Sequence, residues 1–264
     1  MPDLPPTASR VLATKVPQIT ILFWTIKVLT TGMGEAASDY LVVTYDPVVV
    51  VASTALLFAV ALIVQLAAPR YVPWKYWLTV AMVGVFGTMV ADVAHVVVGI
   101  PYLASTAIFA VALAAVLLLW RRTEGTLSIH SVSSRRRELI YWATVVVTFA
   151  LGTALGDMTA QTLHLGYLGS AGPFAVVIAL PGLAYRSRLI GPILAFWASY
   201  IVTRPLGASV ADYLGVDHSR GGLAIGSGTV AVVAALLTAV LVGIGSQAGR
   251  PRAVQAGAMI GAAE

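Results

Sequence analysis

Long apolar segments, separated by short polar turns, run through almost the whole chain. Most of them have about the 20 residues or more that an α-helix needs to cross the hydrocarbon core of a bilayer. Pro and Gly mark several of the breaks between them. The pattern predicts an all-α integral membrane protein with eight transmembrane helices. The predicted spans are residues 18–42, 48–66, 73–98, a fourth that follows Pro101 and ends at Trp120, 139–163, 172–185, 190–214 and 223–245.

The longest internal polar segment, residues 121–138, divides these spans into two halves. It is rich in Ser, Thr, Gly and Arg, which is typical of an exposed loop. We therefore expect a first four-helix half at residues 18–120 and a second at 139–246. A polar arm at residues 1–17 and a polar tail at 247–264 would flank them. The arm has no apolar core of a signal peptide, so the first span is expected to stay in the membrane.

One skeleton recurs on the first, third, fifth and seventh predicted spans. It is an aromatic residue followed by Trp, a Gly ten residues after the Trp, and an Asp five residues after the Gly, and no copy needs a gap. Internal repetition of this kind indicates an architecture built from copies of one unit. The copies are Phe23-Trp24, Gly34, Asp39; Tyr76-Trp77, Gly87, Asp92; Tyr141-Trp142, Gly152, Asp157; and Phe196-Trp197, Gly207, Asp212.

Each repeat joins a motif-bearing helix to a plainer apolar helix. Because two helices separate successive motifs, all four motif helices should cross the membrane in the same direction. Gly34 and Gly152 are 118 residues apart, and Gly87 and Gly207 are 120 apart, which fits duplication of a four-helix unit. We expect four parallel two-helix repeats in two pseudo-symmetric halves, with the axis along the membrane normal. The copies are not identical, since two share Gly-Thr and the other two share Asp-Tyr-Leu.

Charged residues make up 10% of the 264 residues, against about 25% in soluble domains. Lys and Arg mark the cytoplasmic loops of membrane proteins, and 13 of the 16 lie in the arm, the even-to-odd connections and the tail. We therefore expect an inner or plasma membrane protein with both termini cytoplasmic. The net charge of +5 is then a topology signal and does not indicate nucleic-acid binding. The 13 are Arg10, Lys15, Arg70, Lys75, Arg121, Arg122, Arg135, Arg136, Arg137, Arg186, Arg188, Arg250 and Arg252.

The four motif Asp residues are expected at one depth, toward the outer third of the membrane. Each follows its Trp by 15 residues, or about 22 Å of helix, and Trp is common in the belts at membrane interfaces. A carboxylate inside a span is costly and usually faces the bundle interior or water. The four Asp either line a polar site, which we favour, or form hydrogen bonds that cap the helix ends. The four motif Gly residues are expected at helix contacts.

Acids outnumber bases inside the predicted spans, because Glu35 joins the four Asp and the bases are Lys27 and Arg204. Unpaired buried carboxylates must protonate, pair or hold a cation, and oxygen ligands suit hard divalent cations. His95 shares a helix face with Asp92 and would favour Mn²⁺, unless it is a packing residue. Lys27 and Arg204 are coupling groups or counter-ions, or they form internal salt bridges. The predicted metal ligands are Asp39, Asp92, Asp157, Asp212, Glu35 and His95.

Two hypotheses about function follow. The first is a proton-coupled exporter of a divalent metal cation, with Mn²⁺ favoured, in which protons and metal compete for the carboxylates. The second is a transporter of a small organic or anionic solute that binds Lys27 and Arg204 while the Asp residues relay protons. An intramembrane aspartyl protease fits poorly, since residues 154–157, ALGD, lack the first Gly of Gly-x-Gly-Asp. We therefore expect that the protein is not an enzyme.

The expected partners are the lipid bilayer, the metal ion as substrate and protons, and a homodimer stays open. Cys is absent, which excludes a disulfide framework and thiolate metal sites. No phosphate-binding Gly-rich loop occurs, so direct ATP drive is not expected. We expect neither a permanently bound cofactor nor a nucleic-acid partner.

Two stretches carry a resemblance to a known family. They are KVLTTGMGEAASDYL at residues 27–41 and LGTALGDMTAQTLHLGYLG at residues 151–169. They resemble a bacterial family of multi-pass proteins described as uncharacterised membrane-anchored proteins, and the resemblance covers nearly the whole chain. It implies the multi-pass architecture and implies no activity.

Overall fold

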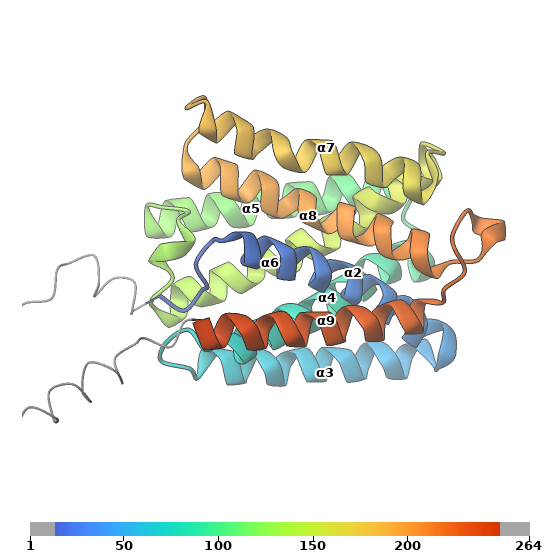
Figure 1. Cartoon of the computed structure of the whole chain (residues 1–264), viewed down its shortest axis with the longest axis horizontal. Coiled ribbons are helices and arrows are strands. Elements are labelled where there is room, and N and C mark those ends of the chain that lie inside the picture. The colour runs from blue at the N-terminus through green and yellow to red at the C-terminus, as the bar shows by residue number, and fades with distance from the viewer. Residues whose placement is uncertain (1–13, 249–264) are drawn as a thin grey trace, which may run out of the picture.

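The computed structural model describes residues 14–248, in which eight long α-helices form one bundle (Figure 1). Seven of them, α3 to α9, are long and apolar enough to cross a membrane. The eighth, α2, is equally long but contains Lys27, Glu35 and Asp39. The described residues contain no strand, and the prediction of an all-α membrane protein is confirmed. The helices are α2 (Ile21–Thr44), α3 (Pro47–Leu66), α4 (Pro73–Asp92), α5 (Tyr102–Glu124), α6 (Arg135–Asp157), α7 (Gly166–Arg186), α8 (Pro192–Gly215) and α9 (Ser227–Ala248).

Local signals in the sequence set several helix ends. The Thr20 side chain accepts a hydrogen bond from the backbone at the start of α2, and Asp46 does the same for α3, where Pro47 takes the first position. Both are favoured arrangements at a helix N-terminus. At the end of α5, Gly125 adopts a left-handed φ of 73°, which suits Gly because it has no Cβ.

The connection predicted over residues 121–138 is shorter in the structure. The helix α5 continues to Glu124, and α6 already begins at Arg135. Arg and Glu are good helix formers, and here they also pair with each other. The Glu124 carboxylate lies 2.7 Å from Arg137 Nε and 3.3 Å from Arg136 Nε. Polar composition alone therefore overestimates this loop.

Each motif helix contacts its two neighbours in an inner ring, in the order α2, α4, α6, α8 and back to α2. Each plainer helix lies outside this ring and packs mainly on the motif helix of the following repeat. Thus α3 packs on α4, α5 on α6, α7 on α8, and α9 returns to α2. Every repeat therefore buries its surface against its neighbours, and the fourth repeat closes on the first.

The inner and outer helices differ in how much of their surface is buried. In the most apolar part of each helix, 44–67% of the residues of α4, α6 and α8 are buried, against 6–22% for α3, α5, α7 and α9. The outer helices expose many Leu, Val and Ile side chains. An apolar exposed surface of this kind suits lipid, which offers no hydrogen-bond partners.

The motif helices share one direction, because successive helices run back and forth, and the start of α2 and the end of α9 lie at the same end of the bundle (Figure 1). The ring therefore has two distinct ends. We call the end with the four aromatic pairs the aromatic end, and the end with the four motif Asp residues the Asp end.

Aromatic side chains fill the aromatic end. Trp77, Trp142 and Trp197 are at most 4% exposed. The hydroxyl oxygens of Tyr76 and Tyr141 lie 2.5 Å apart in the same cluster. The interpretation of the motif Trp residues as members of an interface belt is wrong for these three, because their rings are buried inside the bundle. Because the four motif helices form a ring, their aromatic side chains meet on the axis of the bundle and close this end.

The first described residues lie across the aromatic end. Lys15 Nζ is 2.6 Å from the buried Glu138 carboxylate, and Gln65 Nε2 donates to the same carboxylate at 2.9 Å. The Lys15 backbone N–H donates to Val132 at 2.9 Å, and Val16 is buried in the aromatic cluster. This part of the predicted polar arm is therefore a buried element that covers the closed end of the ring.

Both α4 and α6 change to a π-helical turn directly after their motif Asp, at Val93–Val97 and Met158–Thr162. Such turns are rare and are frequent at functional sites. The other two motif helices, α2 and α8, continue as α-helix past Asp39 and Asp212. The copies thus fall into the same two pairs that their sequences indicate.

Candidate functional site

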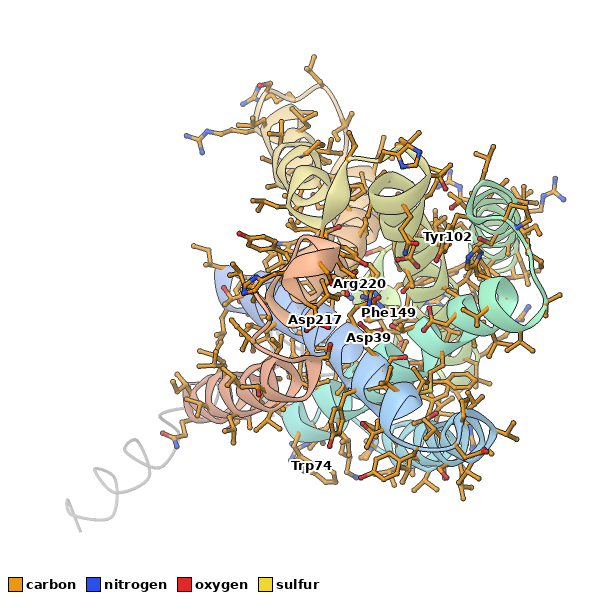
Figure 2. The ribbon with its side chains drawn as sticks, turned by 90° about the vertical axis from the view of Figure 1, so that its right-hand side faces the viewer. Asp39, Trp74, Tyr102, Phe149, Asp217 and Arg220 are labelled. Atoms are coloured by element: carbon orange, nitrogen blue, oxygen red, sulfur yellow. The ribbon has the colours of Figure 1, made fainter. Side chains whose placement is uncertain are left out.

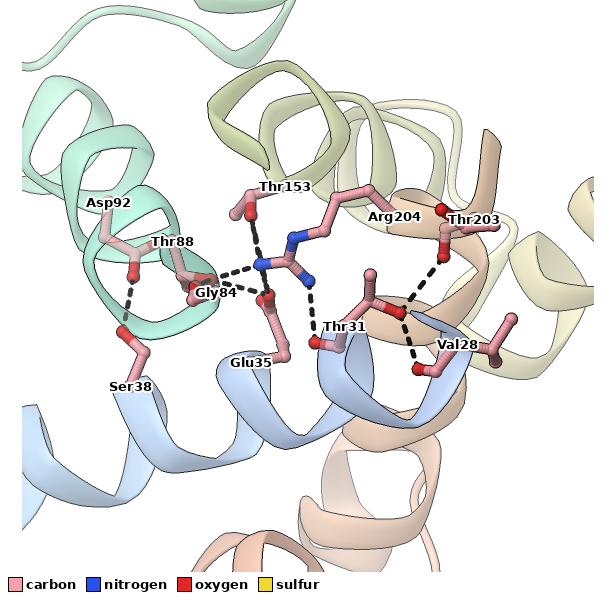
Figure 3. A network of polar contacts seen from close by, with 10 residues as sticks. All are labelled: Val28, Thr31, Glu35, Ser38, Gly84, Thr88, Asp92, Thr153, Thr203 and Arg204. Carbon is pink, nitrogen blue, oxygen red and sulfur yellow. Dashed lines mark hydrogen bonds and ion pairs between the residues drawn. The ribbon is translucent and has the colours of Figure 1, made fainter. Parts of the chain in front are cut away.

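Side chains from all four motif helices meet at Arg204, inside the ring (Figure 3). Arg204 Nη2 lies 2.5 Å from Glu35 Oε2 and 2.7 Å from Thr153 Oγ1, and it also bonds to Thr88 Oγ1. Arg204 Nη1 donates to the Thr31 carbonyl at 3.2 Å. The Arg204 side chain is 0% exposed and that of Glu35 is 5% exposed. A charged pair is therefore enclosed by hydroxyl groups at the centre of the bundle.

The repeat itself explains why these residues meet. Glu35, Thr88 and Thr153 each follow the motif Gly of their copy. In the fourth copy this position is Ala208, and Arg204 enters from one turn earlier in α8. Equivalent positions lie at the same height in a ring of like-directed helices, so the three acceptors surround one guanidinium.

The four motif Gly residues lie at contacts between neighbouring motif helices. A Cβ on Gly34 would lie 2.6 Å from the backbone carbon of Gly84, and one on Gly87 would lie 2.7 Å from Phe149 Cβ. Gly152 likewise meets the Arg204 side chain, and Gly207 meets the side chain of Thr31. In each pair, the motif Gly faces the residue that precedes the next motif Gly by three positions. Close helix approach of this kind is what small residues permit.

Lys27 occupies a different place from the one expected of a counter-ion. Its side chain is buried, and Nζ has no hydrogen-bond partner among the described residues. Nζ lies 4.0 Å from the centre of the Phe149 ring and 4.3 Å from that of Tyr200. Aromatic faces attract cations. Glu35 therefore pairs with Arg204, and Lys27 lies between this pair and the aromatic end.

The four motif Asp residues lie at the Asp end, where one hydrogen bond to a carboxyl group is found. Ser38 Oγ donates to Asp92 Oδ2 at 3.4 Å. Asp212 is 8% exposed, whereas Asp39, Asp92 and Asp157 are partly exposed. None of the four motif Asp residues is therefore fully exposed, and Asp39 lines a pocket at this end.

The structure does not gather the six predicted metal ligands into one site. Within residues 14–248, no three His, Asp or Glu side chains lie close enough together to hold a metal. Glu35 is engaged by Arg204. His95 Nδ1 lies 2.8 Å from the Ile100 carbonyl, and its ring stacks on Tyr102. His95 therefore occupies the packing position that was its alternative.

A pocket of about 330 Å³ opens at the Asp end. Asp39, Asp217 and Arg220 line it, together with the ends of α2 and α8. Sequence reasoning missed Arg220 as a site residue, and it also missed Thr88 and Thr153. A signal for the two Thr residues exists, because they share the repeat position of Glu35. No comparable signal marks Arg220, which lies in a connection outside the repeated motif.

Comparison with known proteins supports the repeat directly. A sequence profile described as Repeat of Unknown Function (DUF347) matches residues 22–71, 75–126, 140–188 and 195–250. Each match starts one residue before an aromatic pair of the motif and covers a motif helix with the outer helix that follows. No curated protein and no solved structure matches the chain. The prediction of four internal repeats is confirmed, and the chain belongs to this DUF347 repeat family of unknown function.

Proposed function

We propose that the protein is a membrane transporter that exchanges a small cation for protons, with Mn²⁺ as the first substrate to test. The observation that carries the proposal is the set of four motif carboxyl groups at one end of a closed ring of helices, next to a pocket. Carboxylates at the mouth of a pore favour cations. They also bind protons, so a metal cation and protons compete for them.

The membrane arrangement that supports this function has eight spans in four parallel two-helix repeats. The cyclic packing of the outer helices on the next repeat supports it, as do the four Gly contacts between successive motif helices. The distribution of Lys and Arg orients the bundle, so that the aromatic end and both termini face the cytoplasm. The Asp end then faces outward.

The two ends of the ring differ in a way that suits alternating access. The aromatic end is closed by buried Trp rings and by the Lys15–Glu138 pair, whereas the Asp end has the pocket. Between them, Arg204 holds Glu35. A cation that moves inward from the motif Asp residues meets Glu35 only by displacing the guanidinium. Arg204 therefore acts as an internal substitute for the transported cation.

A second candidate is a transporter of a small anionic solute. The observation that favours it is the unpartnered Lys27 Nζ, which lies near Arg204, whose Nε also has no partner among the described residues. Two buried donors on one axis would suit a carboxylate or phosphate. Under this alternative, replacing Lys27 by Met would abolish transport, and the Asp variants would change mainly its pH dependence.

The test of the proposal is transport by purified protein in liposomes, with a metal indicator and a pH indicator trapped inside. The wild type is expected to move Mn²⁺ and to move protons in the opposite direction. Asp212→Asn is expected to reduce Mn²⁺ flux by roughly tenfold or more, because it removes a carboxylate from the motif set. The matched control, Asp46→Asn, removes an exposed acid at the same end that lies outside the pocket, keeps a residue that can cap α3, and should retain flux. Wild-type flux in Asp212→Asn would contradict the proposal.

A further inference from the structure

The connection between α8 and α9 is an ordered hairpin that projects at the Asp end and returns to the end of α8. Backbone N–H groups of Leu223, Ile225 and Gly226 donate to carbonyls in the last turn of α8, at 2.7, 3.0 and 3.1 Å. Within the hairpin, His218 Nδ1 lies 2.8 Å from the Gly222 carbonyl. These contacts fix the short helical turn His218–Arg220 at its tip. Arg220 is thus held by a defined backbone.

The Arg220 side chain reaches across to a different repeat. Its Nη2 donates to the Tyr167 hydroxyl of α7 at 2.7 Å, and its guanidinium carbon lies 5.9 Å from the centre of that ring. Tyr167 itself is buried. A hydrogen bond and a cation–π contact therefore hold the guanidinium in one position.

This position places a positive charge at the mouth of the acidic site. Arg220 shares the pocket with Asp39 and Asp217, and the end-on view of Figure 2 shows Arg220 and Asp39 near the middle of the bundle. Within the described residues, Arg220 forms no ion pair with a carboxylate at 4 Å or less. The connections at the Asp end contain no other Lys or Arg. Arg220 is thus near the carboxylates without neutralising them by contact.

We propose that Arg220 is a tethered cation that competes with the transported cation for the motif Asp residues, and that the Tyr167 hydroxyl holds it away from them. This inference rests on the proposed function. It names Arg220 and Tyr167 as the residues that control access of the cation to the motif Asp residues. A fixed positive charge repels an approaching cation across an open pocket, and salt screens the repulsion. An Arg220 released from Tyr167 would reach toward Asp39 and occupy the site of the substrate.

The two residues give opposite expectations in the Mn²⁺ flux assay. Arg220→Gln is expected to lower the KM for Mn²⁺ by roughly fivefold at low ionic strength, with a smaller effect in high salt. Tyr167→Phe keeps the ring, loses the hydroxyl, and is expected to raise KM. Arg220→Lys retains the charge and should stay nearer to the wild type than Arg220→Gln. An unchanged KM in Arg220→Gln at all salt concentrations would overturn the inference.

A second measurement needs no transport. The chain has no Cys, so Val43→Cys, at an exposed position that lines the pocket, introduces the sole thiol. Arg220→Gln should speed labelling by a cationic thiol reagent by about threefold and leave a neutral reagent unchanged. Equal labelling of both backgrounds by the cationic reagent would overturn the role of Arg220. A wild type that transports no cation would instead overturn the proposed function, and the labelling result would still decide the charge effect.

Discussion

Replacing Glu35 by Gln is expected to destabilise the protein by about 3–5 kcal/mol. The carboxylate lies 2.5 Å from Arg204 Nη2, and both side chains are buried at the centre of the ring. Gln has nearly the same shape but no charge, so the variant leaves a guanidinium buried without its counter-ion. The hydroxyls of Thr88 and Thr153 stay in place, but they do not neutralise the charge. The measurement is the free energy of unfolding by denaturant in detergent micelles.

Two further variants separate the buried charge from the general cost of a substitution. The double variant Glu35→Leu with Arg204→Met removes both charges, and it is expected to be more stable than Glu35→Gln alone. Glu124→Gln removes the partner of Arg137 where the end of α5 meets the start of α6 and that Arg is 31% exposed, and it should cost about 1 kcal/mol or less. If Glu35→Gln unfolds as the wild type does, the ion pair is not what holds the centre of the bundle.

Gly34→Ala is expected to destabilise the protein by about 3 kcal/mol. An added Cβ would lie 2.6 Å from the Gly84 backbone carbon and 2.7 Å from its Cα. Because these are backbone atoms, no rotamer change relieves the overlap, and α2 and α4 must move apart. That movement would also disturb the Glu35–Arg204 pair one residue away. The helix propensity of Ala, which favours it over Gly by about 1 kcal/mol, offsets only part of the cost.

Gly156→Ala is the matched control for this prediction. Gly156 lies on the motif helix α6, but a Cβ there would have its nearest neighbour at 3.8 Å, which is an ordinary contact. Its stability should match or exceed that of the wild type. If Gly34→Ala and Gly156→Ala prove equally stable in the same denaturant series, α2 and α4 can accommodate a Cβ at Gly34, and the prediction is wrong.

The helices and the repeat were accessible from the sequence because apolar length and a gapless motif are local properties. The way the repeats associate was not. Short connections allow an outer helix to pack on the motif helix of its own repeat or on that of the next, and both choices have the same local sequence. The structure selects the next repeat in all four cases. The two choices are distinguished only by the packing of the outer helices in three dimensions.

The site was predictable in part. Four Asp residues in one register indicate a common depth, and the structure places them at one end of the ring. The depth of a Trp does not tell whether it faces lipid or the ring axis, so the closure by Trp77, Trp142 and Trp197 was missed. The choice of Arg204 over Lys27 as the partner of Glu35 was also hidden. It depends on the distance between side chains of α8 and α2 across the ring, and the spacing of residues along one helix gives no information about that distance.

The most direct test of the proposed acidic cation site is calorimetric titration of purified protein with Mn²⁺, at about pH 5.5 and about pH 7.5. The wild type is expected to bind Mn²⁺ more weakly at the lower pH, because protons compete for the carboxylates. Asp39→Asn and Asp157→Asn are expected to lose the binding, and the control Asp46→Asn, at an exposed acid outside the pocket, should keep it. If folded wild-type protein gives no heat of binding with Mn²⁺ or with other divalent cations, the account is contradicted and transport of an anionic solute is favoured.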